Sequence, residues 1–217
     1  MNFNLYIIVR WWPRLLTAFG TTTLYFVVCS IAATLFAILV SMLIGLRVKW
    51  LTLFLKGYIA VFRNTPLLVQ LFLLFYGLPF IGIKIPAFYC ALFGIMFNEG
   101  AFISEILRGY IEVVPKGDVE AAESLGLNRL QVLRYAIMPQ AIRDAIPAIT
   151  GQISIIIKDT SLFSMIMIPE LTRVSNSIYT RTFDTTGFVA SAILYLFLFF
   201  LLTIISKLIE QRFKVKR

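Results

Sequence analysis

Apolar residues gather along the chain in five stretches, each with the roughly 20 positions that a helix needs to cross a hydrocarbon core of about 30 Å. Polar or turn-forming segments separate these stretches. We therefore predict an all-α membrane protein with five transmembrane helices in one domain, residues 1–217. The expected spans are residues 22–46, 57–78, 86–107, 145–168 and 187–206.

The positions of the basic residues predict how these spans are oriented. Five spans create two sets of connections, and thirteen of the 20 Lys and Arg residues fall in one set against five in the other. Cytoplasmic connections carry the excess of Lys and Arg in membrane proteins. We therefore expect the N-terminus outside and the C-terminus in the cytoplasm.

The composition agrees with a membrane protein and narrows the alternatives. The chain is 59% apolar and 14% charged, with a mean hydropathy of +0.88, which excludes a disordered tail, a collagen-like fibre and a disulfide-stapled secreted domain. Most of the Lys and Arg residues behind the net charge of +9 lie in the connections that are expected to be cytoplasmic. Nucleic acid is therefore not an expected partner. Cys29 and Cys90 lie in apolar runs and are expected to be buried, and without His no metal site is expected.

The N-terminal segment, residues 1–20, is expected to lie at the membrane interface. Trp11, Trp12 and Pro13 stand between Arg10 and Arg14. Tryptophan rings favour the headgroup level, where basic side chains reach water. We interpret this segment as a membrane anchor, with contact to a partner as the alternative.

The connection between the third and fourth spans, residues 108–144, is unusually long for an ordered loop. Asp118 and Glu120 suit the first turn of a short helix, and Gly126 suits the left-handed residue that ends it. Ala121 and Ala122 would give that helix a nearly smooth surface, which allows close approach of a partner.

A second short helix is expected in the same loop. Asn128 can cap its start, with Gln131 in the position of a capping box, and Pro139 is expected to break it. On physical grounds alone, the loop could equally be an amphipathic helical hairpin that rests on the membrane surface.

The loop resembles a known signature. Its spacing is similar to the EAA motif of the membrane subunits of binding-protein-dependent ABC importers. Residues 63–70 and 158–162 resemble segments of the polar amino-acid branch of that family, although Asn64 stands where related proteins often have Gly. The matching loop residues are Ile111, Glu120, Ala121, Ala122, Gly126, Leu127, Leu133, Met138 and Pro139.

The resemblance implies a permease subunit of a type I importer in a bacterial plasma (inner) membrane. Its expected partners are two ABC ATPase subunits, a second permease copy or paralogue, an extracytoplasmic solute-binding protein and the amino-acid substrate. The chain has no phosphate-binding loop, so it is not expected to be an enzyme or to bind a cofactor directly. ATP and Mg would act through the partner ATPase. The resemblance assigns the ATPase-coupling helix to Glu120, Ala121, Ala122 and Gly126.

Polar side chains inside the expected spans are the candidate substrate-binding residues, because charges at this depth are costly and usually face a cavity or a partner. Gln152 and Asp159 are seven residues apart and share one helix face. Asn98 and Glu99 lie at mid-depth on the third span. Lys158 is a candidate as well, and it could instead neutralise Glu99 or Asp159.

Other charged residues in the spans have structural interpretations. Glu105 and Arg108 are three positions apart, and we predict an ion pair between them. Arg63 is expected near a cytoplasmic helix end, where its long side chain could reach water. Pro66 frees a backbone carbonyl, so Thr65 is a candidate substrate contact, with a purely structural kink as the alternative.

Two other classes of protein would also carry buried charges. One is an intramembrane enzyme that uses Glu99, Asp159 or Lys158 as an acid or base, and the missing His and nucleophile motifs count against it. The other is a channel or a secondary transporter that works without an ATPase. The sequence leaves open which amino acid is carried and whether the permease pairs with itself or with a paralogue.

Overall fold

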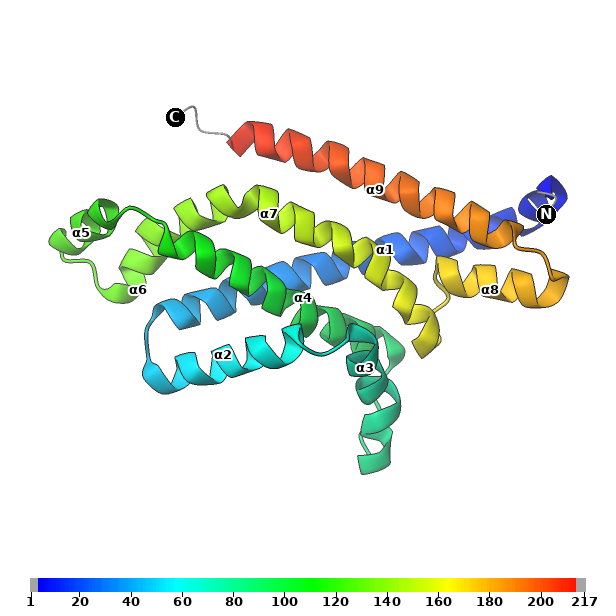
Figure 1. Cartoon of the computed structure of the whole chain (residues 1–217), viewed down its shortest axis with the longest axis horizontal. Coiled ribbons are helices and arrows are strands. Elements are labelled where there is room, and N and C mark those ends of the chain that lie inside the picture. The colour runs from blue at the N-terminus through cyan, green and yellow to red at the C-terminus, as the bar shows by residue number, and fades with distance from the viewer. Residues whose placement is uncertain (1–3, 214–217) are drawn as a thin grey trace.

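The structure is a computed structural model that describes residues 4–213, apart from the side chain of Phe213. Every regular element in this range is helical, so the predicted all-α class is confirmed there (Figure 1). The basic residues at 214–217, which contribute to the orientation argument, lie outside the described range. The elements are α1 (Leu5–Gly45), α2 (Lys49–Arg63), α3 (Leu67–Phe72), π-helix Leu73–Gly77, 3-10 helix Leu78–Ile81, α4 (Ala87–Glu112), α5 (Lys116–Ser124), α6 (Arg129–Val132), π-helix Leu133–Ile137, α7 (Met138–Asp159), 3-10 helix Thr160–Ile166, α8 (Leu171–Thr182) and α9 (Thr186–Phe213).

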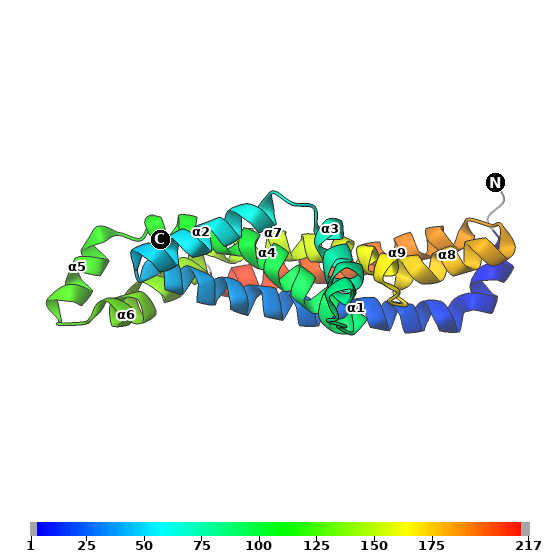
Figure 2. The ribbon, with the colours of Figure 1, turned by 90° about the horizontal axis from the view of Figure 1, so that it is seen from below.

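The long helices α1, α4, α7 and α9 run lengthwise in an elongated bundle (Figures 1 and 2). Cys29, Ala33 and Ala37 of α1 are fully buried, and these small side chains let α1 and α4 approach closely. On α4, a Cβ added to Gly100 would lie 2.9 Å from Phe36 of α1. Cys90 is also fully buried, so the expected burial of both cysteines is confirmed.

The N-terminal segment is continuous with the first expected span. A single helix of 41 residues, α1, runs through Pro13, so residues 22–46 form its second part and no separate interfacial element precedes them. Trp11 packs against Leu15 and against Ile178 of α8, whereas Trp12 remains 42% exposed. Only one of the two rings is therefore available to a surrounding interface.

Three helices, α1, α4 and α9, are long and apolar enough to cross a membrane alone. Two pairs of helices are bent: α2 turns by 102° into the α3 segment within the second expected span, and the α7 segment turns by 51° into α8 at the end of the fourth expected span, residues 145–168. The count is therefore three spans, or up to five if each bent pair crosses once. An apolar run indicates how long a membrane-spanning segment is, but it does not show where that segment bends. The sequence analysis therefore treated each expected span as one straight helix.

The bend corrects the expected position of Arg63. The sequence placed this residue about six positions from a helix end at the cytoplasmic surface. The structure instead begins α2 at Lys49 and ends it at Arg63. At 1.5 Å per residue, Arg63 lies about 21 Å along α2 from its start. The guanidinium lines a polar cleft there, and the Arg63 side chain is 38% exposed.

Pro139 starts a helix instead of breaking one. It is in the first turn of α7, where its missing N–H costs no hydrogen bond. The preceding π-helix, Leu133–Ile137, connects α6 to α7 without a loop. The capping box of Asn128 and Gln131 is present as predicted.

The start of α9 is hydrogen-bonded to the residue that precedes α1. The backbone N–H of Thr186 donates to Asp184, and the backbone N–H of Asn4 donates to the Thr186 hydroxyl. Hydrogen bonds from Thr186 hold the pKa of the Asp184 carboxyl below its usual range. The α1 and α9 ends are thereby fixed beside each other.

Candidate functional site

A hydrogen-bonded cluster holds the sharp bend between α2 and α3. Asn98 Nδ2 donates to the Phe62 carbonyl oxygen at 2.9 Å. Gln70 Nε2 donates to the same oxygen at 3.1 Å and to Thr65 Oγ1 at 2.7 Å. Helix termini leave carbonyls without helical partners, and Pro66 has no N–H to offer them. Asn98 and Thr65, both predicted as substrate contacts, are therefore engaged in holding this bend.

Gln70 is a functional residue that the sequence reasoning missed. Its side chain is 8% exposed, and its amide reaches both sides of the break. An amide buried in an apolar span four residues after Pro66 was the available signal, because buried polar groups need partners.

A second cluster joins α4 to α7. Gln152 Nε2 donates to Glu99 Oε2 at 2.8 Å, and Glu99 is 2% exposed. The Asp159 carboxyl lies close enough to the Glu99 carboxyl to interact with it electrostatically. Three of the predicted substrate residues therefore converge, and two of them are acidic. A pair of carboxyls in so little water suits a shared proton or a bound cationic group.

Lys158 does not join this cluster. It lines an apolar groove of about 530 Å³ together with Tyr195, Leu196 and Phe199 of α9. In the described part of the chain, no ion pair within 4 Å links Lys158 to a carboxylate. Adjacent residues on a helix point about 100° apart, so Asp159 and Lys158 face different surroundings.

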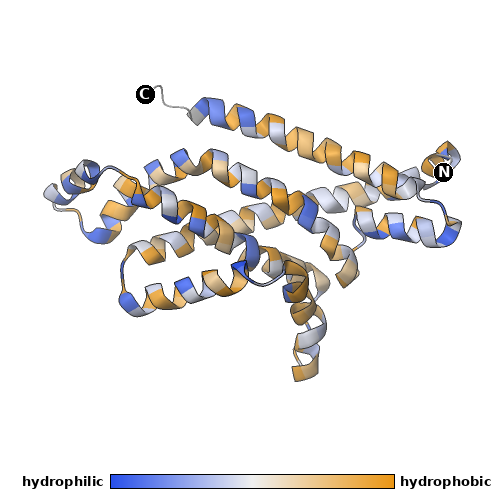
Figure 3. Cartoon of the chain, in the orientation of Figure 1, coloured by the Kyte–Doolittle hydropathy of each residue, from blue (hydrophilic) through white to orange (hydrophobic). Residues whose placement is uncertain are grey.

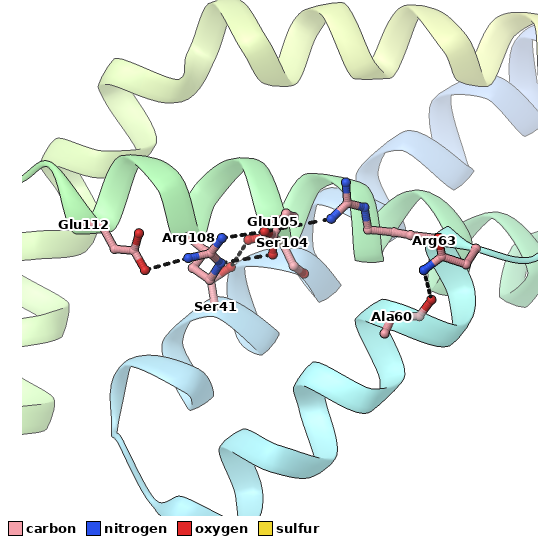
Figure 4. Close-up of polar contacts among 8 residues, drawn as sticks. Ser41, Ala60, Arg63, Ser104, Glu105, Arg108 and Glu112 are labelled. Carbon is pink, nitrogen blue, oxygen red and sulfur yellow. Dashed lines mark hydrogen bonds and ion pairs between the residues drawn. The ribbon is translucent and has the colours of Figure 1, made fainter.

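A third cluster of charges follows α4 toward its C-terminal end (Figure 4). Arg108 donates to both oxygens of Glu105 and, through Nη1, to Glu112 at 2.6 Å. The predicted Glu105–Arg108 pair is therefore confirmed. Arg63 approaches Glu105 from α2, with Nη1 at 3.9 Å from Oε1.

The loop helix α5 lies at one end of the molecule, far from the N-terminus (Figure 1). Figure 3 shows hydrophilic residues along much of this helix, in contrast to the apolar bundle. Glu120, Ala121 and Gly126 are exposed, and Gly126 has a φ of +75°, which favours glycine. Ala122 is 7% exposed because it packs against the chain itself. The accessible surface of α5 thus includes Ala121 but not Ala122.

The loop is attached firmly to the bundle. Arg129 Nε donates to the carbonyl oxygen of Gly45, the last residue of α1, at 3.0 Å. Leu133 packs so closely on Gly45 that an added Cβ would lie 2.7 Å from it. A force on α5 and α6 would therefore reach the long helices directly.

Long apolar helices, broken spans and polar clusters between them define a class, the membrane transport permease. Residues 37–215 match the family of binding-protein-dependent transport system inner membrane components. The chain belongs to this family, the permease subunits of ABC importers.

Individual relatives agree with this assignment. The chain is 34% identical over 212 residues to YckA, a probable amino-acid ABC transporter permease of Bacillus subtilis, covering 97% of this chain and 94% of YckA. It is 39% identical over 161 residues to the glutamine permease GlnP of Escherichia coli, covering 73% and 74%.

Two solved structures resemble the fold. One, an amino acid ABC transporter with histidines, has a TM-score of 0.87 at 29% identity and covers 98% of this chain and 100% of its own. The MetNI methionine transporter in an inward-facing conformation has a TM-score of 0.77 at 15% identity, over 93% and 96% of the two chains, and resembles it in fold alone.

Proposed function

We propose that this permease subunit carries polar amino acids across a bacterial inner membrane in an ATP-driven importer. The observation that carries this proposal is the cluster between α4 and α7, in which the buried Glu99 meets the half-buried Gln152 and Asp159. Two carboxyls and an amide match the ammonium group that every amino acid carries, and they also suit a cationic side chain. The names of the relatives YckA and GlnP support an amino-acid substrate.

We propose a smaller set of substrate-binding residues than the sequence suggested, and the observed contacts support this choice. Glu99, Gln152 and Asp159 are the proposed contacts, because their polar groups meet at one point. Asn98 and Thr65 act indirectly by holding the bend. Lys158 faces α9, so it has no direct part in this cluster.

ATP hydrolysis, with its Mg, would be supplied by two ATPase subunits that dock on α5. Support comes from the exposure of Glu120, Ala121 and Gly126 and from the attachment of the loop to α1. In the proposed orientation, α5 is cytoplasmic and the N-terminus is outside, where a solute-binding protein would deliver the substrate.

A second permease, identical or paralogous, would complete the pathway. The α3 segment projects sideways from the bundle in Figure 1 and carries exposed apolar side chains. Phe80 is 92% exposed and Ile81 is 71% exposed. A partner subunit or lipid must cover such a surface.

The proposal is tested with the complex reconstituted in liposomes. Glu120→Lys and Gly126→Arg should abolish the ATPase activity that the binding protein stimulates, because they add charge or bulk to the docking surface of α5. Lys49→Glu, a charge reversal at the start of α2, serves as the matched control. Wild-type stimulation in both α5 variants would reject the docking assignment.

The same liposomes separate the remaining classes of protein. An importer requires a co-purifying ATPase and takes up amino acids only with ATP. Uptake that persists without ATP would identify a channel or a secondary transporter, and the intramembrane enzyme would show no uptake at all.

A further inference from the structure

A polar cleft opens between α2 and α4, separate from the Glu99 cluster. Its volume is about 520 Å³, and no residue of the proposed substrate cluster lines it. It extends from the C-terminal end of α2 toward the C-terminal end of α4, the end that leads to α5. The polar and aromatic side chains that line it are Lys56, Arg63, Asn64, Phe102, Glu105 and Arg108.

The charges in this cleft are only partly paired (Figure 4). Arg108 is held between Glu105 and Glu112 and has both carboxylates as hydrogen-bond partners. Arg63 has only a distant partner, since its Nη1 is 3.9 Å from the Glu105 oxygen that Arg108 already contacts. Lys56 has no ion pair within 4 Å among the residues that the structure describes. Three cations therefore face two carboxylates, and one positive charge is left over.

The Arg63 guanidinium, whose one ion pair is the long contact to Glu105, is held in place. The Arg63 Cζ lies 5.3 Å from the ring centre of Phe102, and the residue ends α2, whose dipole favours a cation there. Its side chain is 38% exposed, so its remaining N–H donors face the cleft. A planar, fixed guanidinium is well suited to bind a carboxylate through two hydrogen bonds.

We propose that this cleft is a subsite for the carboxylate of an amino acid, bound by Arg63 and Lys56 and reached from the cytoplasm. The inference rests on the proposed function, because it makes the cleft the last polar contact of the transported amino acid before release. One surplus positive charge matches one carboxylate. A phosphate group carries up to about two negative charges and would leave the cleft negative.

The test uses the whole complex in liposomes, with ATP in the lumen and the binding protein outside. The lumen then corresponds to the cytoplasm. Uptake of labelled L-glutamine is measured while unlabelled L-glutamine in the lumen is varied, with L-arginine as the second probe. Luminal amino acid should slow uptake by the wild type. Arg63→Gln and Lys56→Gln should each raise the half-inhibitory luminal concentration by about tenfold or more, the effect of losing one charge-assisted hydrogen bond.

Matched controls isolate the carboxylate. The α-amides L-glutaminamide and L-argininamide have a neutral group in its place and should not inhibit from the lumen. Lys49→Gln removes a positive charge from α2 outside the cleft and should behave as the wild type. Thermal melting of each purified variant complex shows whether the protein still folds. Arg63→Lys keeps a positive charge and should therefore restore part of the inhibition that Arg63→Gln loses.

Several results would overturn the inference. They are wild-type uptake that is insensitive to luminal amino acid, equal half-inhibitory concentrations in wild type and both variants, or equal inhibition by the amides. Inhibition by luminal inorganic phosphate at the same concentrations would assign the cleft to phosphate. Loss of inhibition when phosphatidylglycerol replaces phosphatidylcholine would assign it to a lipid headgroup. If the wild type takes up neither probe in any of these assays, the proposed transport function itself fails.

Discussion

At the scale of single residues, the position of Glu99 demands a functional explanation. A carboxyl that is 2% exposed and has a neutral amide as its hydrogen-bond donor bears a desolvation cost that one such bond does not offset. The neighbouring Asp159 adds like charge instead of neutralising it. A shared proton or a bound cationic group would offset this cost.

Two substitutions of Glu99 distinguish the contribution of its charge from the contribution of its hydrogen-bond acceptor. Glu99→Gln keeps an oxygen that accepts from Gln152, so melting of the complex should change little, while uptake falls about tenfold or more with the lost charge. Glu99→Leu also removes the acceptor and should destabilise the subunit by about 1–3 kcal/mol. Uptake assays and melting curves measure both effects. Unchanged uptake in the Gln variant would show that this carboxyl does not contact the substrate.

The sequence located the residues of this cluster better than it located their neighbours. Gln152 and Asp159 were predicted to share a face, because helical spacing fixes direction along one helix. Lys158 stayed ambiguous, since spacing does not say which helix packs on which side. The role of Asn98 depends on the bend between α2 and α3, which lies in a different segment of the chain. No local sequence pattern around Asn98 describes that bend.

At the scale of elements, the bends distinguish this protein from a plain bundle of straight helices. Both breaks have polar side chains beside them. Asn98 and Gln70 donate to a backbone carbonyl at the first break, and the Glu170 carboxylate accepts from backbone N–H groups at the second. Pro66 is the one sign of the sharper bend in the sequence, and no local pattern indicates its angle of 102°. The starts of α4 and α9 were predicted to within one residue, and both helices extend beyond the expected C-terminal end. Helix α1 begins at Leu5, well before the expected span of residues 22–46.

The bend should weaken when Asn98 loses its donor. Asn98→Ala removes the bond to the Phe62 carbonyl, while Gln70 still donates to that oxygen. We therefore expect a moderate loss of about 1 kcal/mol, and a larger loss in the double variant with Gln70→Ala. Chemical denaturation in detergent measures both. Additive losses would indicate that the two side chains act independently.

Helix α5, the proposed ATPase-docking surface, offers a pair of neighbouring positions with opposite expectations. Ala121→Arg changes only the exposed surface of α5, so the permease should melt normally and fail to retain its ATPase during purification. Ala122→Arg places a charge at a position that is 7% exposed, so the permease itself should melt at a lower temperature. An Ala121→Arg variant that keeps its ATPase would show that docking uses another surface.

At the scale of the whole molecule, α5 and the N-terminus lie at opposite ends of an elongated bundle (Figure 1). Arg129 and Leu133 connect the α5–α6 end to α1, and α1 runs the full length of the bundle to contact α8 and α9 at the far end. The molecule therefore contains one continuous path from the proposed ATPase surface to the opposite side. This path can connect the two sides of a membrane only if the two ends of the bundle face different compartments.

Thiol labelling determines which compartment each end faces. Both native cysteines are fully buried, so the unmodified chain should give little background labelling. Ser124→Cys places a thiol on exposed α5, and Thr180→Cys places one near the exposed C-terminal end of α8, at the other end of the bundle.

In intact cells, a membrane-impermeant maleimide should react with the thiol at position 180 and not with the thiol at 124, because the excess of Lys and Arg predicts that α5 is cytoplasmic. Inverted membrane vesicles should reverse this pattern, and detergent should expose both sites. Labelling at 124 in intact cells would invert the topology, so that neither an ATPase docked on α5 nor a cytoplasm-facing carboxylate subsite would be possible.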